Sequence, residues 1–299
     1  MRELREADGS GRPESDVPRA GAVRERAEAR SPAEVQRPAE TRSRDEYAAE
    51  VRSGLSLEAV GRFEPRGAGL PEMRTGDSAA YLDARLAARP WLAAARDRPP
   101  AVQRLFAALD QGGGHAHIRH EGWVTEEMNR RRVAYLEDPA QLDPAKRAAG
   151  IDGLKSPEGA HRGRNASSRI TDPDMFAVAF ARGIEHRAVR DALDTKFIPG
   201  QVPRAVSVPI SDLLGPDGHR YCTGWRLQPV EGSMNTARAR RAAWIEAGGG
   251  GPEPETRAVE TFAGGTIVFA FAPTAAADGY EVVTMYPRPP GGEQRGDSR

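Results

Sequence analysis

The segment TIVFAFAPTAAADGYEVVTMY, residues 266–286, decides the fold. Its two halves, Thr266–Phe271 and Tyr280–Tyr286, are rich in β-branched and aromatic residues, which favour strands. Asp278-Gly279 lies just before the second half and is a turn signal, because glycine accepts the backbone angles of tight hairpin turns. The segment therefore predicts two antiparallel strands near the C-terminus.

The residues before this segment divide into two patterns. After Pro203 further strands are predicted at Ala205–Ile210, His219–Leu227 and Val259–Phe262, and Gly264-Gly265 is a second turn signal. Before Pro203 the apolar residues recur at helical spacing instead. Helices first and antiparallel strands last indicate an α+β fold.

Four helices are predicted from apolar spacing and capping residues. One spans residues 123–136 with Thr125 as its N-cap, and another begins at Thr171-Asp172-Pro173-Asp174, where a proline follows a capping residue. Two shorter helices are predicted near Ala188–Leu193 and Ala237–Ala247.

Composition divides the 299 residues into four parts. Residues 1–75 are rich in Arg, Glu, Ala, Pro and Ser, and their few large apolar side chains predict a disordered leader or linker. Residues 76–111 are predicted to form short helices that pack on the following domain, residues 112–290. Residues 291–299 are predicted to be a disordered tail.

Charge and cysteine content restrict the possible partners. Lys and Arg total 43, as do Asp and Glu, so no overall field draws the chain to nucleic acid or anionic membranes, and any RNA contact must be local. The single cysteine, Cys222, excludes an intramolecular disulfide and is expected to be buried beside a strand. Without an apolar N-terminal run or a membrane-spanning stretch, the chain is expected to be made in the cytoplasm without a Sec signal and to have no membrane partner.

Three histidines lie close together in GGHAHIRHEG, residues 113–122. His115 and His117 on a strand, with His120 as a third ligand, would suit zinc, although no Cys, Asp or Glu ligand follows at a matching spacing. A surface loop with incidental histidines is a second interpretation. Acid–base catalysis is a third, because imidazole titrates near neutral pH.

Two hydroxyl side chains stand two residues apart near the end of the last predicted strand. Thr284 and Tyr286 should therefore face the same side, with Val283 and Met285 on the other. Taken alone, Tyr286 is most simply a residue that packs at a sheet edge. The Asn165–Asp172 segment, taken alone, is a strand or turn that leads into a capped helix.

Taken together, these segments resemble one family. A Gly-Gly-His-x4-His-x-Gly segment precedes a helix that contains arginine, an Ala-Ser-Ser-x-x-Thr-Asp segment enters a second helix, and the last strand contains Tyr-x-x-x-Thr-x-Tyr-Pro. This order is similar to the bacterial RNase A-like C-terminal toxin domains of contact-dependent inhibition and other polymorphic toxin systems. The resemblance implies a curved antiparallel sheet that holds RNA in its cleft.

The resemblance carries five candidate catalytic residues onto this sequence: His115, His120, Arg131, Thr284 and Tyr286. His120 would be the base or acid, and Arg131, with an arginine on either side, would hold the non-bridging phosphate oxygens. The hydroxyls of Thr284 and Tyr286 would donate to the same oxygens or orient the phosphate, and Tyr286 could instead stack on a base.

The implied reaction is metal-independent RNA cleavage by attack of a 2′-OH on the adjacent phosphorus, with no cofactor. The implied partners are RNA, with tRNA as a candidate, and a cognate immunity protein that is acidic where it meets Arg131. Secretion by a dedicated system and action in a target cell's cytoplasm are implied in the same way. Two alternatives stay open, a catalytically inactive binding or accessory domain and a different small nuclease. The stretches Pro139–Arg164 and Gly200–Ala258 are longer than usual for the family, which leaves room for a changed activity.

Overall fold

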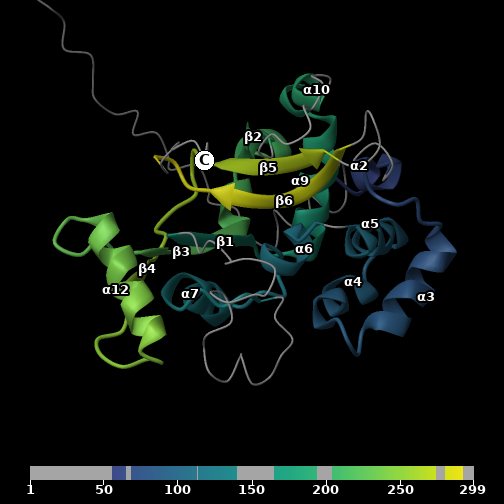
Figure 1. Cartoon of the computed structure of the whole chain (residues 1–299). Helices are drawn as coiled ribbons and strands as arrows, with labels where there is room; N and C mark the ends of the chain where they lie inside the picture. The colour runs from purple at the N-terminus through teal and green to yellow at the C-terminus, as the bar shows by residue number, and fades with distance from the viewer. Residues whose placement is uncertain are drawn as a thin grey trace, which may run out of the picture. The chain divides into compact units, whose positions relative to one another are not determined.

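The computed structural model describes residues 56–64, 69–112, 114–139, 165–193, 204–273 and 280–291. All of these residues belong to one unit of the chain, residues 42–299. Most helices come from the first half of this unit, and the strands come from the second half and pair antiparallel (Figure 1). The predicted α+β class is confirmed.

The strands form two three-stranded sheets. In chain order they are β1 Ala166–Ile170, β2 Arg204–Pro209, β3 Cys222–Leu227, β4 Thr256–Ala258, β5 Thr266–Pro273 and β6 Tyr280–Arg288. In one sheet β3 lies between β1 and β4, and in the other β5 lies between β2 and β6. Figure 1 shows the β2–β5–β6 sheet above the β1–β3–β4 sheet, and β1 contacts β6 where the sheets meet. The two antiparallel strands predicted from residues 266–286 are the pair β5 and β6.

Two predicted strands differ from the observed ones. The strand predicted at His219–Leu227 begins only at Cys222, because the 3₁₀ helix η3, Gly218–Tyr221, precedes it. The strand predicted at Val259–Phe262 is wrong, because β4 ends before it and the side chain of Phe262 turns into the core, where it is 2% exposed. The short apolar run at Val259–Phe262 therefore reflects burial in the core and not pairing in a sheet.

Two of the helices begin at N-cap residues that the sequence predicts, Thr125 and Asp172. Besides η3, the described helices are α2 Ser56–Arg62, α3 Thr75–Arg85, η2 Pro90–Leu92, α4 Ala93–Arg96, α5 Pro100–Gln111, α6 Ala116–Arg119, α7 Glu126–Ala134, α9 Pro173–Glu185, α10 Arg187–Leu193, α11 Ile210–Leu214 and α12 Met234–Glu246. The hydroxyl of Thr125 accepts from the N–H of Met128 at 3.1 Å, and the carboxylate of Asp172 accepts from the N–H groups of Asp174 and Met175. Both predicted N-caps are therefore confirmed.

The core is built around α9. Phe176 packs against Phe106 of α5 with ring centroids 5.6 Å apart. Phe180 packs against Phe63, which follows α2, at 5.7 Å and against Phe269 of β5 at 6.5 Å. The N-terminal helices and the β2–β5–β6 sheet therefore share one hydrophobic core.

The folded part begins earlier than residue 76, where composition places its start. Four apolar side chains from the expected leader lie in the core, each at most 8% exposed: Val60, Phe63, Leu70 and Met73. Their burial depends on long-range packing against α5 and α9, which local composition does not reveal. Residues 1–55 of the predicted leader, residues 140–164 of the long Pro139–Arg164 stretch and residues 292–299 of the predicted tail lie outside the described residues.

The β2–β5–β6 sheet has one face in the core, and its second face is turned towards His120. Ile267, Phe269 and Met285 fill the core face and are fully buried. Thr284 and Tyr286, which alternate with Met285 along β6, project from the opposite face and are half-buried. This second face carries the candidate site.

Candidate active site

The histidine segment forms a short helix, not the strand that a zinc site would use. His115 precedes the first residue of α6 and His120 follows its last residue. His117 lies within α6 and is fully buried, with its Nε2 3.6 Å from Oδ1 of Asp110. The described residues contain no group of three or more His, Cys, Asp or Glu side chains placed to hold a metal ion.

A buried network around Asp110 fixes α6 to the N-terminal helices. The carboxylate of Asp110 accepts from the hydroxyl of Tyr81 at 2.9 Å and from Nε1 of Trp91 at 3.0 Å, and it pairs with Arg89. Burial alone would raise the pKa of this carboxyl, but the nearby His117 and the hydrogen bonds from Trp91 and Tyr81 hold the pKa below the usual value. Burial also lowers the pKa of His117. The helices before residue 111 therefore help to set the position of both flanking histidines.

His115 is held against β6 by its backbone. Along β6 the register shifts, since Ala270 pairs with Thr284 whereas Phe271 pairs with Val282, so Val283 opposes no residue of β5. The carbonyl of Val283 instead accepts from the N–H of His115 at 2.8 Å. Sequence alternation alone does not predict this shift, which brings the histidine segment to the strand that carries Thr284.

The ring of His120 is fixed on both sides. Its Nδ1 lies 2.7 Å from the carbonyl oxygen of Ser168. A carbonyl only accepts, so Nδ1 carries the proton and Nε2 keeps its lone pair in the neutral ring. The ring lies against that of Tyr286, with centroids 5.3 Å apart, and the hydroxyl of Ser168 donates to the carbonyl of Pro287. His120, β1 and β6 thus form one connected assembly.

The surroundings of His120 favour the neutral form of its imidazole. Its side chain is buried, and burial lowers the pKa of the imidazole well below its usual value, with a further contribution from the charge of Arg132. The charges of His115 and Arg119 act in the same direction, and the bond to Ser168 opposes them. At neutral pH the ring is therefore uncharged, which is the form a general base needs.

Thr284, Tyr286 and Arg288 form a polar row on the second face of the β2–β5–β6 sheet. The hydroxyl oxygen of Thr284 is buried and has no hydrogen-bond partner in the described structure. The hydroxyl of Tyr286 accepts from Nη2 of Arg288 at 3.1 Å. Arg288 was not expected as a site residue, although its position two residues after Tyr286 is a signal that could have suggested it.

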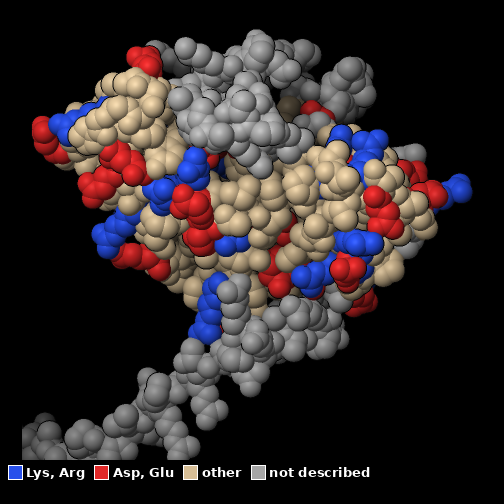
Figure 2. All heavy atoms as spheres, turned by 90° about the horizontal axis from the view of Figure 1, so that it is seen from below, with Lys and Arg blue, Asp and Glu red and all other residues tan. Residues whose placement is uncertain are grey.

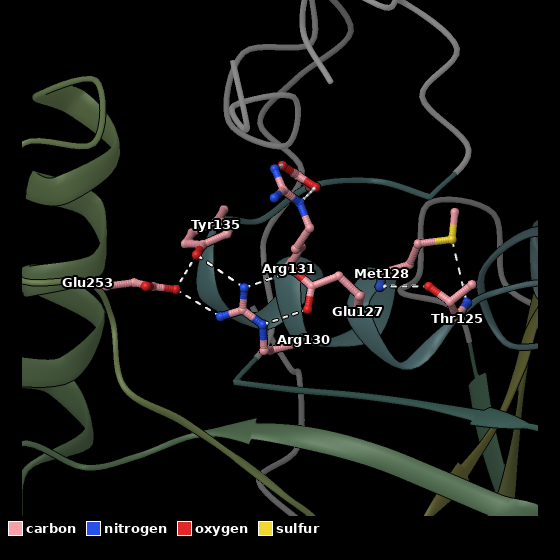
Figure 3. A network of polar contacts seen from close by, with 8 residues as sticks. Thr125, Glu127, Met128, Arg130, Arg131, Tyr135 and Glu253 are labelled. Atoms are coloured by element: carbon pink, nitrogen blue, oxygen red, sulfur yellow. Dashed lines mark hydrogen bonds and ion pairs between the residues drawn. The ribbon is translucent and has the colours of Figure 1, made fainter. Parts of the chain in front are cut away.

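Arg131 contacts none of the other four candidate side chains in the described structure. Its guanidinium forms two bonds to the carboxylate of Glu137 and lies over the ring of Tyr135, 5.2 Å from the centroid. Figure 3 shows the neighbouring Arg130 between Glu127, Glu253 and the hydroxyl of Tyr135. Both arginines thus belong to ion pairs at the end of α7.

Arg132 is the arginine of α7 whose charge acts on His120. Its Nη1 donates to the carbonyl of Arg119 at 3.5 Å, directly before His120 in the chain. Three consecutive arginines look alike in the sequence, and only the orientation of α7 separates them. The structure therefore brings His115, His120, Thr284 and Tyr286 into one region, with Arg132 rather than Arg131 beside His120.

Glu121 is a buried acid that sequence reasoning did not single out. Its side chain is fully buried, one oxygen accepts from the N–H of Trp123 at 3.0 Å, and the other has no hydrogen-bond partner in the described structure. Burial raises the pKa of this carboxyl to about 7. Its position directly after His120 is the only sequence signal.

Cys222 is buried at the start of β3, as predicted, and burial raises the pKa of its thiol to about 12. Basic and acidic side chains are interspersed on the face shown in Figure 2, so any attraction of RNA to that face is local. Among the described helices, none has the length and apolar character needed to cross a bilayer.

Comparison with known proteins identifies no relative, since no family model matches the chain and neither the curated proteins nor the solved structures contain a significant match.

Proposed function

We propose that the chain is a metal-independent endoribonuclease with an RNase A-like active site, which cleaves RNA by attack of a 2′-OH on the adjacent phosphorus. The observation that carries the proposal is the setting of His120. The Ser168 carbonyl directs the lone pair to Nε2, and burial and Arg132 keep the ring uncharged near neutral pH. Tyr286 and Thr284 present hydroxyls from the same face of β6.

In the proposed reaction, Nε2 of His120 takes the proton of the 2′-OH. The O2′–P bond forms, the P–O5′ bond breaks, and the products are a 2′,3′-cyclic phosphate and a free 5′-hydroxyl. His115, whose charge is felt by His120, is the second imidazole of the site and gives the leaving oxygen its proton. The guanidinium of Arg132 and the hydroxyls of Thr284 and Tyr286 stabilise the charge on the phosphorane oxygens.

The proposal includes a biological role. A ribonuclease of this kind would act as a toxin in a target cell, and the producing cell would need an immunity protein that covers the site. A partner with acidic side chains would complement the positive charge of Arg132 and Arg288. Production of the chain without that partner should arrest growth, and production of the His120→Ala variant should not.

A second candidate function is an RNase A-like binding domain without turnover. The observation that favours it is the burial of His120, whose side chain is only 6% exposed. The two functions differ in their products, since a binding domain would retain RNA but leave it intact.

The test is incubation of the full chain with tRNA in EDTA. We expect cleavage, loss of cleavage in His120→Ala, and unchanged cleavage in the control His186→Ala, whose imidazole is partly exposed at the end of α9. DNA and 2′-O-methyl RNA should remain intact, because they lack the attacking hydroxyl. Cleavage of either would favour a different nuclease class. Activity that EDTA abolishes and zinc restores would contradict the metal-independent mechanism, and RNA that stays intact at all protein concentrations would contradict nuclease function.

A further inference from the structure

A hollow of about 200 Å³ lies at the end of β6, beyond the proposed catalytic residues. Arg288 and Pro289-Pro290 form one side of it, and Ser207 of β2 and Thr266 of β5 form another. The turn Gly264-Gly265 and Gly291 complete the lining. The hollow is therefore bounded by a cation, two hydroxyls, a glycine turn and an apolar wall, and no carboxylate lines it.

We propose that this hollow binds the phosphate next to the one that is cleaved, so that it is a second phosphate subsite for the RNA strand. The inference rests on the proposed ribonuclease function for the identity of the ligand. The anion-binding chemistry itself is argued from the residues that line the hollow.

Arg288 is the central residue of the subsite. Within the described residues no carboxylate forms an ion pair with it, whereas Arg119 pairs with Asp138 and Arg131 pairs with Glu137. The hydrogen bond of Arg288 to Tyr286 goes to a neutral hydroxyl, so its positive charge is not neutralised. A guanidinium presents several donors in a planar fork, which suits the two oxygens of a phosphate.

The rest of the lining suits the same ligand. The hydroxyls of Ser207 and Thr266 are further donors for phosphate oxygens. Gly265 allows the turn to approach β6, because a Cβ at this position would clash with the carbonyl oxygen of Arg288. Pro289 and Pro290 offer an apolar surface against which a ribose or base can rest.

Tyr286 connects the hollow to the proposed catalytic centre. Its hydroxyl accepts from Arg288, and its ring lies 5.3 Å from that of His120. Two residues of a strand span about 7 Å, so the row from Tyr286 to Arg288 follows the direction in which an extended RNA strand would leave the site. An RNA strand bound both at the catalytic centre and in the hollow would therefore be held on either side of Tyr286.

The test measures binding of a 2′-O-methyl trinucleotide, which cannot be cleaved by the proposed mechanism, with no terminal phosphate or with one at its 5′ or 3′ end. We expect a phosphate at one end to tighten binding to the wild-type chain about 10-fold, the effect of a charge-assisted hydrogen-bond pair. Arg288→Gln should lose this gain, and Arg288→Lys should keep part of it. The control Arg62→Gln, in an exposed ion pair on α2, should keep all of it.

Two further measurements distinguish the loss of the phosphate contact from a folding defect. Thr266→Val, which removes only a hydroxyl, should reduce the gain by about threefold. The slope of log affinity against log salt should fall by about 0.7 in Arg288→Gln if one phosphate contact is lost. An equal gain in Arg288→Gln and wild type, or no gain from a phosphate at either end, would overturn the subsite. Cleavage of RNA is measured separately. If RNA is cut but the gain in affinity from a terminal phosphate does not depend on Arg288, only the subsite is contradicted. If the gain depends on Arg288 but RNA is not cut, only the nuclease function is contradicted.

Discussion

The imidazole of His120 lies against the ring of Tyr286, with centroids 5.3 Å apart and planes inclined by 34°. The two residues come from opposite ends of the described sequence motifs and meet because β1 contacts β6. The ring of Tyr286 therefore shields one side of His120, while its hydroxyl points to Arg288. Substitutions of Tyr286 can therefore separate the contribution of its ring from that of its hydroxyl.

Tyr286→Phe removes the hydroxyl and keeps the ring. We expect kcat for RNA cleavage to fall about 10²-fold, the cost of one lost donor to a charged transition state, with little change in the unfolding midpoint. Tyr286→Ala should lose more activity and also expose His120, which raises the pKa of the imidazole towards its usual value. Steady-state kinetics and NMR titration of His120 measure the two effects. Full activity in Tyr286→Phe would assign the residue a packing role alone.

The second prediction concerns the arginines of α7. Arg132→Gln should raise the pKa of His120, because a positive charge that disfavours the imidazolium is removed. The acidic limb of the kcat/KM profile should therefore move to higher pH, and kcat should fall about 10²-fold. Arg131→Gln is the matched control, since it breaks the pair with Glu137 and should cost less than about 1 kcal/mol of stability. A loss of activity confined to Arg131→Gln would restore the assignment made from sequence spacing.

The sequence predicted the elements whose signals are local. The period of two in residues 266–286 and the capping residues Thr125 and Asp172 required no knowledge of tertiary contacts. The orientation of α7, which separates Arg131 from Arg132, depends on packing and left no local signal. The register shift at Val283 likewise arises from pairing with β5.

The roles of the three histidines in residues 113–122 also could not be predicted from local sequence. Three histidines in six residues were open to three interpretations, a zinc site on a strand, a surface loop and acid–base catalysis. The structure separates them: His117 turns into the core towards Asp110, and His120 turns towards Tyr286. Glu121 was not singled out from the sequence, and its carboxyl lies near Arg169 and Asp172, which follow much later in the chain.

Glu121 gives a prediction about stability and pH. The folded-state pKa of its carboxyl is raised to about 7, above the ordinary value of 4.5, so between these values the unfolded chain has lost a proton that the folded chain keeps. This contribution to stability is therefore present below pH 4.5, decreases as pH rises through the window, and is lost above about pH 7. Glu121→Gln has no proton to lose, so its free energy of unfolding relative to wild type should increase by up to about 3 kcal/mol between pH 4.5 and 8. Urea denaturation at the two pH values measures it, and a pH-independent difference would contradict the buried carboxyl as its source.

The last prediction concerns the glycine before His115. A Cβ at Gly114 would clash with the backbone carbonyl of Val282, so Gly114→Ala forces α6 away from β6 and lengthens the bond between the N–H of His115 and Val283. We expect a loss of about 1–3 kcal/mol in stability, the range for overpacking of a close contact. Cleavage should fall further than stability alone explains, because His115 is displaced.

Gly76→Ala is the control for this substitution. Gly76 lies in α3, where a new Cβ meets no atom within 4 Å, and alanine in a helix should stabilise the chain by about 0.5–1 kcal/mol. Thermal unfolding and RNA cleavage of both variants separate the two effects. If Gly114→Ala retains wild-type stability and activity, neither requires the close approach of the histidine segment to β6. That result would contradict the assignment of His115 to the site.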